Sequence, residues 1–392
     1  MRSSHMIRVG LAIAGAAILG ALAACIGVPP RPQEAPVEPR TAAPAHSTAR
    51  WVAAAWSDLP GFAADRATEL WPALLAGCAR PAAGWAQTCA RALLDPPAPT
   101  DDAVRQWLMA QLQPYQVRAD EGQAEGLATG YFEPELEATR SPQGRFQVPL
   151  YAPPLQLLAA AAPRRPWYTR AQIETLPAAR AALAGREIAW VEDPLDALLL
   201  QVQGSGRLRM RQPDGRSTLL RVGFAGHNEQ PYRSLGRWLV EQGELGAAQA
   251  SWPAIKAWAQ VHPDRLQELL WANPRVVFFR VEPLADPASG PRGAQGVPLT
   301  PGRSVAVDPL AVPLGAMLWL DTTEPNSAAP LRRLVMAQDT GSAITGAVRA
   351  DLFFGWQPPA QVLAGRMKQP LRWWALWPRD LPPPAPMAAA MR

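Results

Sequence analysis

Proline and glycine recur along the whole of this 392-residue chain, which contains 44 prolines and 29 glycines. Proline lacks a backbone donor and breaks helix interiors, and both residues mark turns. The chain therefore predicts many short strands and loops rather than long helices. Its hydrophobic content of 48% is enough for a packed core, and its length predicts one large domain or two modest ones.

The distribution of charge excludes one class of partner. The formal net charge is +5, and lysines and arginines are interleaved with acidic residues instead of forming a basic block. Nucleic-acid-binding proteins usually gather their basic residues into a patch or stripe. We therefore expect no nucleic-acid partner. Diffuse positive charge is typical of a solvated surface, although it would also favour an anionic polymer.

The first 24 residues have the pattern of a signal peptide. Arg2 and Arg8 precede an apolar stretch, Val9–Ala24, which is too short to span a bilayer comfortably. The stretch ends in Leu22-Ala23-Ala24-Cys25, which is similar to the bacterial lipobox, where the cysteine is diacylated and becomes the mature N-terminus. The sequence thus predicts lipidation of Cys25; the alternative is a run of small residues with a chance cysteine.

The residues after Cys25 predict where the protein is held. Ile26 stands where an aspartate would retain a lipoprotein in the inner membrane, so we expect an outer-membrane lipoprotein that faces the periplasm. Residues 26–47 are rich in proline, alanine and charged residues and predict a flexible tether. Met6 is an alternative start of the chain.

Two further cysteines remain, Cys78 and Cys89. In an oxidising periplasm they would form one disulfide that closes a short loop; the alternative is two buried thiols. The histidines have no ligand spacing with these cysteines, so we expect no metal site. No phosphate-binding loop or Ser-His-Asp pattern is recognised either, and we expect no cofactor.

The periodicity of apolar residues divides the chain. Apolar residues recur with a helical period over positions 51–113, and they alternate with polar residues, as in a strand, over 130–150. From residue 276 onwards the sequence predicts short strands separated by turns. Between them, Leu198–Gln203 predicts a buried strand that enters Gly204-Ser205-Gly206, and a second strand follows the turn at 213–215. Helices are expected over Tyr232–Gly243 and Ser251–Trp271. A strand-rich module at roughly 130–235 is thus inserted into a chain whose helical start and β-rich end fold together.

Three aspartates stand out near the C-terminus: Asp308, Asp339 and Asp351. Each lies at or near the end of a short apolar run, where a strand gives way to a turn. General acid catalysis requires a carboxyl group that stays protonated near neutral pH. The apolar residues after Asp351 could raise its pKa by desolvation. Carboxylates at strand ends predict acid chemistry on a polymer.

Six motifs in order resemble the membrane-bound lytic transglycosylase A (MltA) family. They cover most of the chain from Thr129 to Gly355. The motifs are TGYFEPELEATR (129–140), DPLDALLLQVQGSGR (193–207), GFAGHNEQPYRSLG (223–236), NPRVVFFR (273–280), LTPGRSVAVDP (299–309) and DTGSAITGAVRADLFFG (339–355). The C-terminal module of this family takes its name, 3D, from three aspartates, which Asp308, Asp339 and Asp351 match.

The resemblance implies a mainly β protein with some α, in which a six-stranded double-psi β-barrel and a smaller inserted β domain hold a glycan strand in a groove between them. The expected division is a signal peptide (1–24), a lipidated cysteine and tether (25–47), a helical part plus barrel (48–130 and 236–378), the insert (131–235) and a loose tail (379–392). It implies a peptidoglycan lytic exotransglycosylase, a lyase that cleaves the β-1,4 bond between N-acetylmuramic acid and N-acetylglucosamine and leaves a 1,6-anhydromuramoyl end. The residues themselves do not distinguish endo from exo action.

The resemblance also assigns roles to the aspartates. Asp351 is implied to be the general acid and then the base, because attack by the sugar's own 6-hydroxyl removes the need for a second carboxylate; the alternative is an aspartate that caps a turn. Asp339 would lie beside Asp351 across a hairpin and stabilise developing positive charge, or else bond the amides of the Thr340-Gly341 turn. Asp308 is expected at the substrate groove, although a turn-stabilising role is favoured for it.

Further residues are expected in the groove by resemblance, where small residues let backbone amides approach N-acetyl groups and an aromatic ring offers a face to a sugar. These residues are Thr129, Tyr131, Gln203, Gly204, Ser205, Gly206, Ala225, Gly226 and Asn228. Gly204-Ser205-Gly206 could instead be only a hairpin turn. The chain departs from the family pattern at Glu229 and Ser342, where glycine is usual.

Two other functions fit the barrel taken alone. One is an expansin-like protein that binds peptidoglycan without cutting it, and the other is a lysozyme-type hydrolase. The motifs that span the insert favour the lytic transglycosylase. Glycan strands and the outer membrane are the expected partners, with cell-wall synthase complexes as further candidates. The sequence does not predict glycan length, a requirement for peptide stems or oligomeric state.

Overall fold

The computed structural model describes residues 49–158, 165–212, 214–247 and 249–384. The predicted signal peptide, Cys25 and the tether lie outside the described residues, as does the end of the expected tail. Within the described residues, no helix is both long and apolar enough to cross a membrane.

The N-terminal part is mainly helical, as predicted, but its first element is a strand. Strand β1 (Ala49–Ala53) pairs with β2 (Leu112–Ala119), which follows the helices directly. Thr100 caps the third helix through its side chain, and two aspartates occupy the first turn, where negative charge favours a helix start. The helical elements are the 3-10 turns Trp56–Asp58, Phe62–Ala64 and Ala67–Leu70 and the helices α1 (Trp71–Cys78), α2 (Ala86–Leu94) and α3 (Asp101–Gln111).

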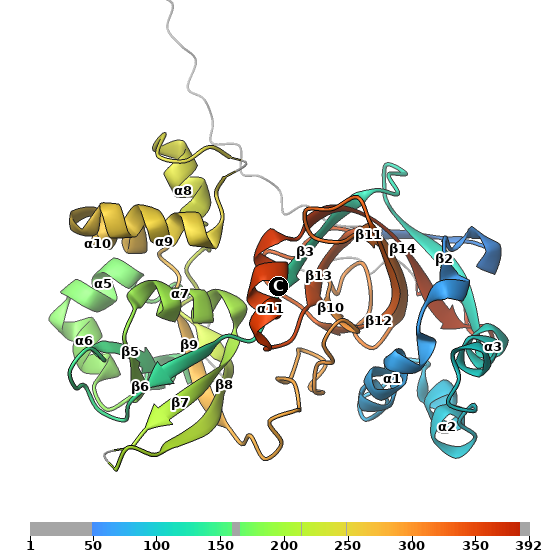
Figure 1. The fold of residues 1–392 in the computed structure, drawn as a ribbon, viewed down its shortest axis with the longest axis horizontal. Coiled ribbons are helices and arrows are strands. Elements are labelled where there is room, and N and C mark those ends of the chain that lie inside the picture. Colours follow the sequence, from blue (N-terminus) through green and yellow to red (C-terminus); the bar gives the residue numbers. More distant parts are fainter. Residues whose placement is uncertain (1–48, 159–164, 213, 248, 385–392) are drawn as a thin grey trace, which may run out of the picture. The chain divides into compact units, whose positions relative to one another are not determined.

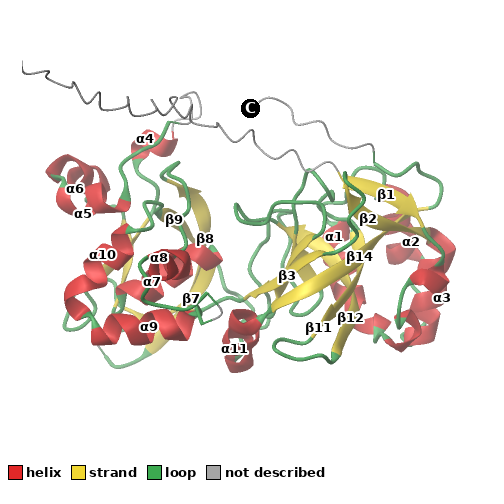
Figure 2. Cartoon of the chain, turned by 90° about the horizontal axis from the view of Figure 1, so that it is seen from above, coloured by secondary structure: helices red, strands yellow, loops and turns green. Residues whose placement is uncertain are grey.

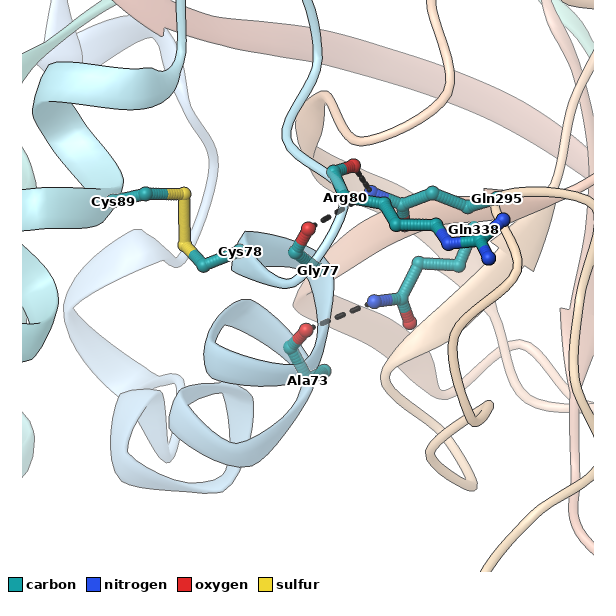
Figure 3. Close-up of a disulfide and its surroundings, with 7 residues drawn as sticks. All are labelled: Ala73, Gly77, Cys78, Arg80, Cys89, Gln295 and Gln338. Carbon is teal, nitrogen blue, oxygen red and sulfur yellow. Dashed lines mark hydrogen bonds between the residues drawn. A yellow bond between two sulfur atoms is a disulfide. The ribbon is translucent and has the colours of Figure 1, made fainter.

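The disulfide between Cys78 and Cys89 is confirmed, with an S–S distance of 2.06 Å, and joins α1 to α2 (Figure 3). Two glutamine side chains fix α1 from the other side. Gln338 donates to the carbonyl oxygen of Ala73 at 2.9 Å, and Gln295 donates to that of Arg80 at 2.8 Å. The small helical part is therefore held both by a covalent bond and by buried hydrogen bonds to the C-terminal half of the chain.

Among the described residues, six strands close into a barrel, as the resemblance implied (Figure 1). Their order is β3-β13-β10-β12-β11-β14, and β14 pairs back onto β3. Two of the pairings, β10 with β12 and β3 with β13, are parallel. The strands are β3 (Gly126–Tyr131), β10 (Ser304–Ala306), β11 (Met317–Thr323), β12 (Pro330–Asp339), β13 (Arg349–Phe353) and β14 (Lys368–Pro378), and helix α11 (Pro358–Arg366) precedes β14.

The inserted unit has sheets of its own. One sheet has the strand order β4-β7-β8-β9 and the other pairs β5 with β6. Helices α8, α9 and α10 pack with α7 in one apolar cluster (Figure 2). The strands are β4 (Glu135–Ala138), β5 (Val148–Tyr151), β6 (Glu187–Val191), β7 (Ser205–Arg211), β8 (Ser217–His227) and β9 (Val277–Glu282). The helices are α4 (Leu155–Leu158), α5 (Arg170–Thr175), α6 (Pro177–Leu183), α7 (Pro194–Gln203), α8 (Leu235–Glu241), α9 (Trp252–Val261) and α10 (Leu266–Trp271), with a 3-10 turn at Pro263–Arg265.

The sheet runs beyond the expected end of the insert. Strand β9 pairs with β8 from His227↔Val277 to Arg221↔Glu282. A boundary at 235 would therefore separate two paired strands from each other, and it would separate α7 from the helices α8, α9 and α10 with which it shares one apolar cluster. The sequence pattern suggested 235 because the helices that follow interrupt the run of strands.

The predicted strand at Leu198–Gln203 is wrong, because these residues belong to helix α7. Asp193 caps this helix through its side chain, Pro194 occupies its first turn, and Gly204 ends it in a left-handed conformation with φ +78°. The apolar run alone does not separate a buried strand from a buried helix, whereas these three end signals do.

Two other predicted elements are each divided in the structure. The single strand expected from residue 130 is β3 in the barrel followed by β4 in the insert, because the chain leaves the barrel between them. The single helix expected over Ser251–Trp271 is α9 and α10, which Pro263 separates.

Candidate active site

The three aspartates occupy neighbouring strands and one loop of the barrel. Asp351 lies within β13, Asp339 is the last residue of β12, and Asp308 follows β10. Strand β10 lies between the other two, and its Ala306 is in register with Asp339 on one side and with Asp351 on the other. The expected hairpin between Asp339 and Asp351 is therefore wrong. The two acids flank an alanine on a third strand.

The Asp351 carboxyl is partly buried and bonds to a neutral group. The Thr129 hydroxyl donates to its Oδ1 at 2.6 Å, and Arg349 in turn donates to the Thr129 oxygen at 2.9 Å. Burial raises the pKa of Asp351 to about 6, while the Thr129 hydrogen bond and the Arg349 charge act in the opposite direction and the Asp339 charge adds to the rise. Asp351 is thus a carboxyl group whose surroundings favour the protonated form.

Asp339 differs from Asp351 in the number of its donors. The backbone amides of Ala294 and Thr340 each donate to its Oδ1 at 2.9 Å, and the Tyr131 hydroxyl donates to its Oδ2 at 2.9 Å. Burial raises the pKa of Asp339, while these three hydrogen bonds oppose the rise because they stabilise the charged form. The alternative expected for Asp339, a bond to an amide of the Thr340-Gly341 turn, is confirmed at Thr340. Asp339 also accepts from Tyr131, and its charge acts on the pKa of Asp351, so the two carboxyl groups lie near each other.

Asp308 is a structural residue of the loop. It is 6% exposed, and it accepts hydrogen bonds from the amides of Leu310 at 3.0 Å and Gly346 at 2.8 Å. The favoured turn-stabilising role is thereby confirmed. Both oxygens of the Asp308 carboxylate, which was also expected at the substrate groove, accept from loop amides.

Thr129 and Tyr131 lie in the site, as expected. Both are in β3, where Thr129 is in register with Asp351 and Tyr131 with Phe353. Burial, and then the charges of Asp339 and Asp351, raise the pKa of the Tyr131 hydroxyl well above its ordinary value. Tyr131 therefore stays a neutral donor between the two acids.

The segment from Gln203 to Gly206 joins a helix to a strand and is not a hairpin turn. The Gln203 side-chain oxygen accepts from the amide of Phe132 at 3.0 Å, which ties the end of α7 to the chain leaving the barrel. Gly204 ends α7 and Ser205 begins β7. A Cβ at Gly206 would overlap the Leu200 side chain and the carbonyl oxygen of Pro134, so only glycine fits there.

The segment from Ala225 to Asn228, which was expected at the substrate groove, is partly exposed as far as His227 and buried at Asn228. Strand β8 has a bulge between Phe224 and Gly226, which leaves Ala225 and Gly226 partly exposed. Asn228, in contrast, is fully buried. Its amide nitrogen donates to Tyr168 at 2.8 Å and Pro274 at 2.9 Å, and its oxygen accepts from Val276 at 2.9 Å. Asn228 therefore holds three backbone segments together.

Comparison with known proteins places the chain in a family. The model of the MltA specific insert domain matches residues 127–280, and that of the 3D domain matches residues 303–377. Membrane-bound lytic murein transglycosylase A of Vibrio cholerae is 33% identical over 285 residues, which cover 71% of this chain and 72% of that protein. The chain belongs to the membrane-bound lytic murein transglycosylase A family. The protein of the same name from Escherichia coli K12 is also 33% identical, over 70% of this chain and 74% of its own.

Solved structures of the family support the fold. MltA from Neisseria gonorrhoeae is 31% identical, with a TM-score of 0.72 and coverage of 88% of this chain and 97% of that one. The lytic transglycosylase LtgG of Burkholderia pseudomallei is 45% identical, with a TM-score of 0.58 and coverage of 84% and 96%. E. coli MltA with bound chitohexaose is 26% identical, with a TM-score of 0.63 and coverage of 84% and 91%.

In this MltA family member, a buried cluster of three charged residues, Glu133, Arg207 and Arg221, lies between the barrel and the insert. The sequence analysis did not predict this cluster. Glu133 is fully buried and accepts from Arg207 Nε at 2.8 Å and from Arg221 Nε at 2.5 Å. The two guanidinium groups also donate to carbonyl oxygens of the returning chain, Arg221 to Gly290 at 3.0 Å and Arg207 to Pro287 at 2.8 Å. The cluster thus joins the chain segment that leaves the barrel to the one that returns. No spacing in the sequence identifies these three residues as partners.

A pocket of about 600 Å³ lies beside this cluster. Arg207 and Trp356 line it, and the Arg207 guanidinium lies 4.0 Å from the centre of the Trp356 ring. None of the three aspartates lines this pocket. Across the described residues, no three histidine, cysteine, aspartate or glutamate side chains are grouped so as to hold a metal ion.

Proposed function

We propose that Asp351 cleaves the β-1,4 bond between N-acetylmuramic acid and N-acetylglucosamine, first as general acid and then as general base. As a member of its family, the protein is an enzyme, a lytic transglycosylase of peptidoglycan. The observation that carries the assignment of Asp351 is its pKa of about 6 in a partly buried position on β13. A catalytic acid is most effective when its pKa lies near the working pH.

In the first step, the Asp351 carboxyl donates its proton to the glycosidic oxygen while the bond from that oxygen to C1 of the muramoyl ring breaks. The Thr129 hydroxyl fixes one carboxyl oxygen, which leaves the other oxygen for the proton. Positive charge develops on the sugar ring as the bond breaks. Asp339 and the Tyr131 hydroxyl are placed to stabilise and orient the ring beside that charge.

In the second step, the 6-hydroxyl of the same muramoyl ring attacks C1, and the Asp351 carboxylate accepts its proton. This step closes the 1,6-anhydro ring and returns Asp351 to its starting protonation state. No water is added, so no second carboxylate is required as a base or nucleophile.

The glycan would bind along the residues that stay accessible: Thr129, Tyr131, Gln203, Gly204, Ser205, Ala225 and Gly226. The chitohexaose in the solved E. coli relative supports a site for β-1,4-linked N-acetyl sugars. Asp308, Gly206 and Asn228 would support this surface from beneath without touching the sugar.

We place the enzyme at the periplasmic face of the outer membrane, held by lipid on Cys25 and a tether over 26–47. The lipobox-like sequence supports this, and so does the description of the relatives as membrane-bound. Such an anchor would let the enzyme reach the cell wall and join cell-wall synthase complexes there.

Mass spectrometry of the fragments released from purified peptidoglycan tests the proposal. A lytic transglycosylase yields muropeptides that lack one water relative to hydrolysis products and that borohydride does not reduce. Reducible ends would show a hydrolase, and protein that pellets with peptidoglycan without releasing fragments would show an expansin-like binder. Loss of the products in an Asp351→Asn variant would assign the acid.

A further inference from the structure

The loop at residues 340–346 is part of the connection, 340–348, between the two strands that carry Asp339 and Asp351. Its ends are tied to the segment after β10. The Thr340 hydroxyl donates to the carbonyl oxygen of Val307 at 2.9 Å, and the amide of Gly346 donates to Asp308 at 2.8 Å. Ser342, near the middle of the loop, has an exposed side chain. The ends of the loop are thus fixed by the barrel, while Ser342 and Ala343 are exposed and Ile344 is buried.

Arg275 of the inserted unit reaches the middle of this loop. Its Nη1 donates to the Ser342 hydroxyl at 2.7 Å, while its Nε donates to the carbonyl oxygen of Gln230 at 2.7 Å. The side chain is partly buried, and this burial lowers the pKa of the Arg275 guanidinium, while the nearby negative charge of Glu229 acts in the opposite direction. One guanidinium group therefore bonds to both the insert and the barrel.

The backbone beneath Arg275 is fixed by a second arginine. The buried Arg170 donates to the carbonyl oxygen of Arg275 at 2.6 Å and to that of Asn273 at 3.1 Å. The Asn273 side-chain oxygen accepts from the amide of Arg275 at 3.2 Å. Arg170 also donates to Gln201 in α7 at 2.7 Å. Arg275 therefore extends from a rigid base, so its contact with Ser342 can hold the loop in one place.

We infer that Arg275 and Ser342 form a clasp that holds the 340–346 loop against the inserted unit and so keeps the glycan-binding surface preformed. The inference rests on the function proposed above and makes both positioning residues, not catalytic ones. Ser342 lies three residues after Asp339, so their Cα atoms are at most about 11 Å apart. A surface that is ordered before the ligand arrives loses less conformational entropy on binding, so it binds more tightly. This gain in binding free energy is the same for the bound substrate and for the transition state, so it changes KM and not kcat.

The first test separates binding from chemistry. Ser342→Ala, Arg275→Gln and the double variant are compared with wild type on soluble peptidoglycan, with release of anhydro products as the readout. We expect KM to rise about two- to tenfold, which corresponds to the loss of one hydrogen bond, and kcat to stay within about twofold. The double variant should be no worse than Arg275→Gln alone, because both changes remove the same contact. Arg275→Lys, which keeps the charge, should recover part of the loss.

Arg233→Gln is the matched control for loss of positive charge, since the Arg233 side chain bonds to Glu241 within the insert at 2.7 Å. It should leave KM unchanged. Melting temperatures should agree among the Ser342 variant, the control and wild type. An unchanged KM in Ser342→Ala and Arg275→Gln, a lowered KM, or additive effects in the double variant would each overturn the clasp.

A second test does not depend on turnover. The affinity for a hexamer of N-acetylglucosamine is measured by titration calorimetry in an Asp351→Asn background, with and without Arg275→Gln. We expect Kd to rise by the same two- to tenfold factor, and an unchanged Kd would contradict the clasp. Failure of the proposed function would look different, because wild-type protein would then release no anhydro products while this binding comparison could still be made.

Discussion

Two carboxyl groups, Asp351 in the barrel and Glu133 where the chain leaves it, differ in what their neighbours allow. Glu133 accepts hydrogen bonds directly from two guanidinium groups and is fully buried. Asp351 accepts from the hydroxyl of Thr129, and the nearby Arg349 bonds to that hydroxyl rather than to the carboxyl. The Thr129 hydroxyl thus stands between the Arg349 guanidinium and the Asp351 carboxyl, whereas Glu133 bonds to its two guanidinium groups directly.

The largest effect expected from this comparison is on catalysis. Asp351→Asn keeps the shape of the side chain but cannot donate and accept a proton, so kcat should fall about 10²- to 10⁴-fold. Glu133→Gln should keep most of its activity per folded molecule. Steady-state kinetics on soluble peptidoglycan measures kcat for both variants. A larger loss of kcat in the folded Glu133→Gln variant than in Asp351→Asn would show that Glu133, and not Asp351, is the catalytic acid.

The next effect concerns stability. Glu133→Gln leaves the buried Arg207 and Arg221 without an anion, and we expect the free energy of unfolding to fall by about 3–5 kcal/mol. Chemical denaturation measures the change. Glu135→Gln is the matched control, because that carboxyl is partly exposed, pairs with Arg209 and should cost no more than about 1 kcal/mol. Equal losses in the two variants would show that the buried cluster contributes no more than a surface pair.

A third effect is the pH dependence of stability at Asp351. Its pKa is about 6 in the folded protein against an ordinary value of 3.8, so folding favours the protonated form. The stability that this proton supplies is complete below about pH 4 and is lost as pH rises through 6, by about 3 kcal/mol in total. Asp351→Asn should therefore match wild type at pH 4 and exceed it in free energy of unfolding at pH 8. Denaturation at both values checks this, and equal curves at pH 8 would contradict the raised pKa.

The smallest effect tests the hydroxyl itself. Thr129→Val removes the hydrogen bond that holds the pKa of Asp351 down, so that pKa should rise by roughly 0.5–1. The alkaline limb of kcat/KM should then move to higher pH by the same amount. Thr129→Ser keeps the hydroxyl and should leave the limb in place. A shift to lower pH in Thr129→Val would show that Arg349 moves onto the carboxyl when the hydroxyl is lost.

Much of the fold could be predicted from the chain. Six motifs in order implied the barrel, the insert and the three aspartates, and the barrel closes as expected. Local end signals could also have identified α7, because Asp193, Pro194 and Gly204 all mark a helix. The strand predicted at Leu198–Gln203 was wrong because the apolar run was given more weight than the helix signals at its two ends.

Long-range pairings could not be predicted in the same way. The partners of Glu133 lie 74 and 88 residues further along the chain, and only the folded sheet brings them together. The burial of Asp308 and Asn228 could not be predicted either, since a motif does not say which side of the backbone a side chain occupies. Ser342 and Glu229, where the resemblance led us to expect glycine, both interact with Arg275.

Strand β3 has a consequence for how such an enzyme could arise. It closes the barrel against β14, supplies Thr129 and Tyr131 to the acids, and ends where the chain departs into the insert. Excision of the insert would therefore cut the polypeptide next to Thr129 and Tyr131, which bond to the two acids, and not at a remote loop. A shortened descendant could inherit the acids of β12 and β13, but it would have to evolve a new way to hold the residues that tune them.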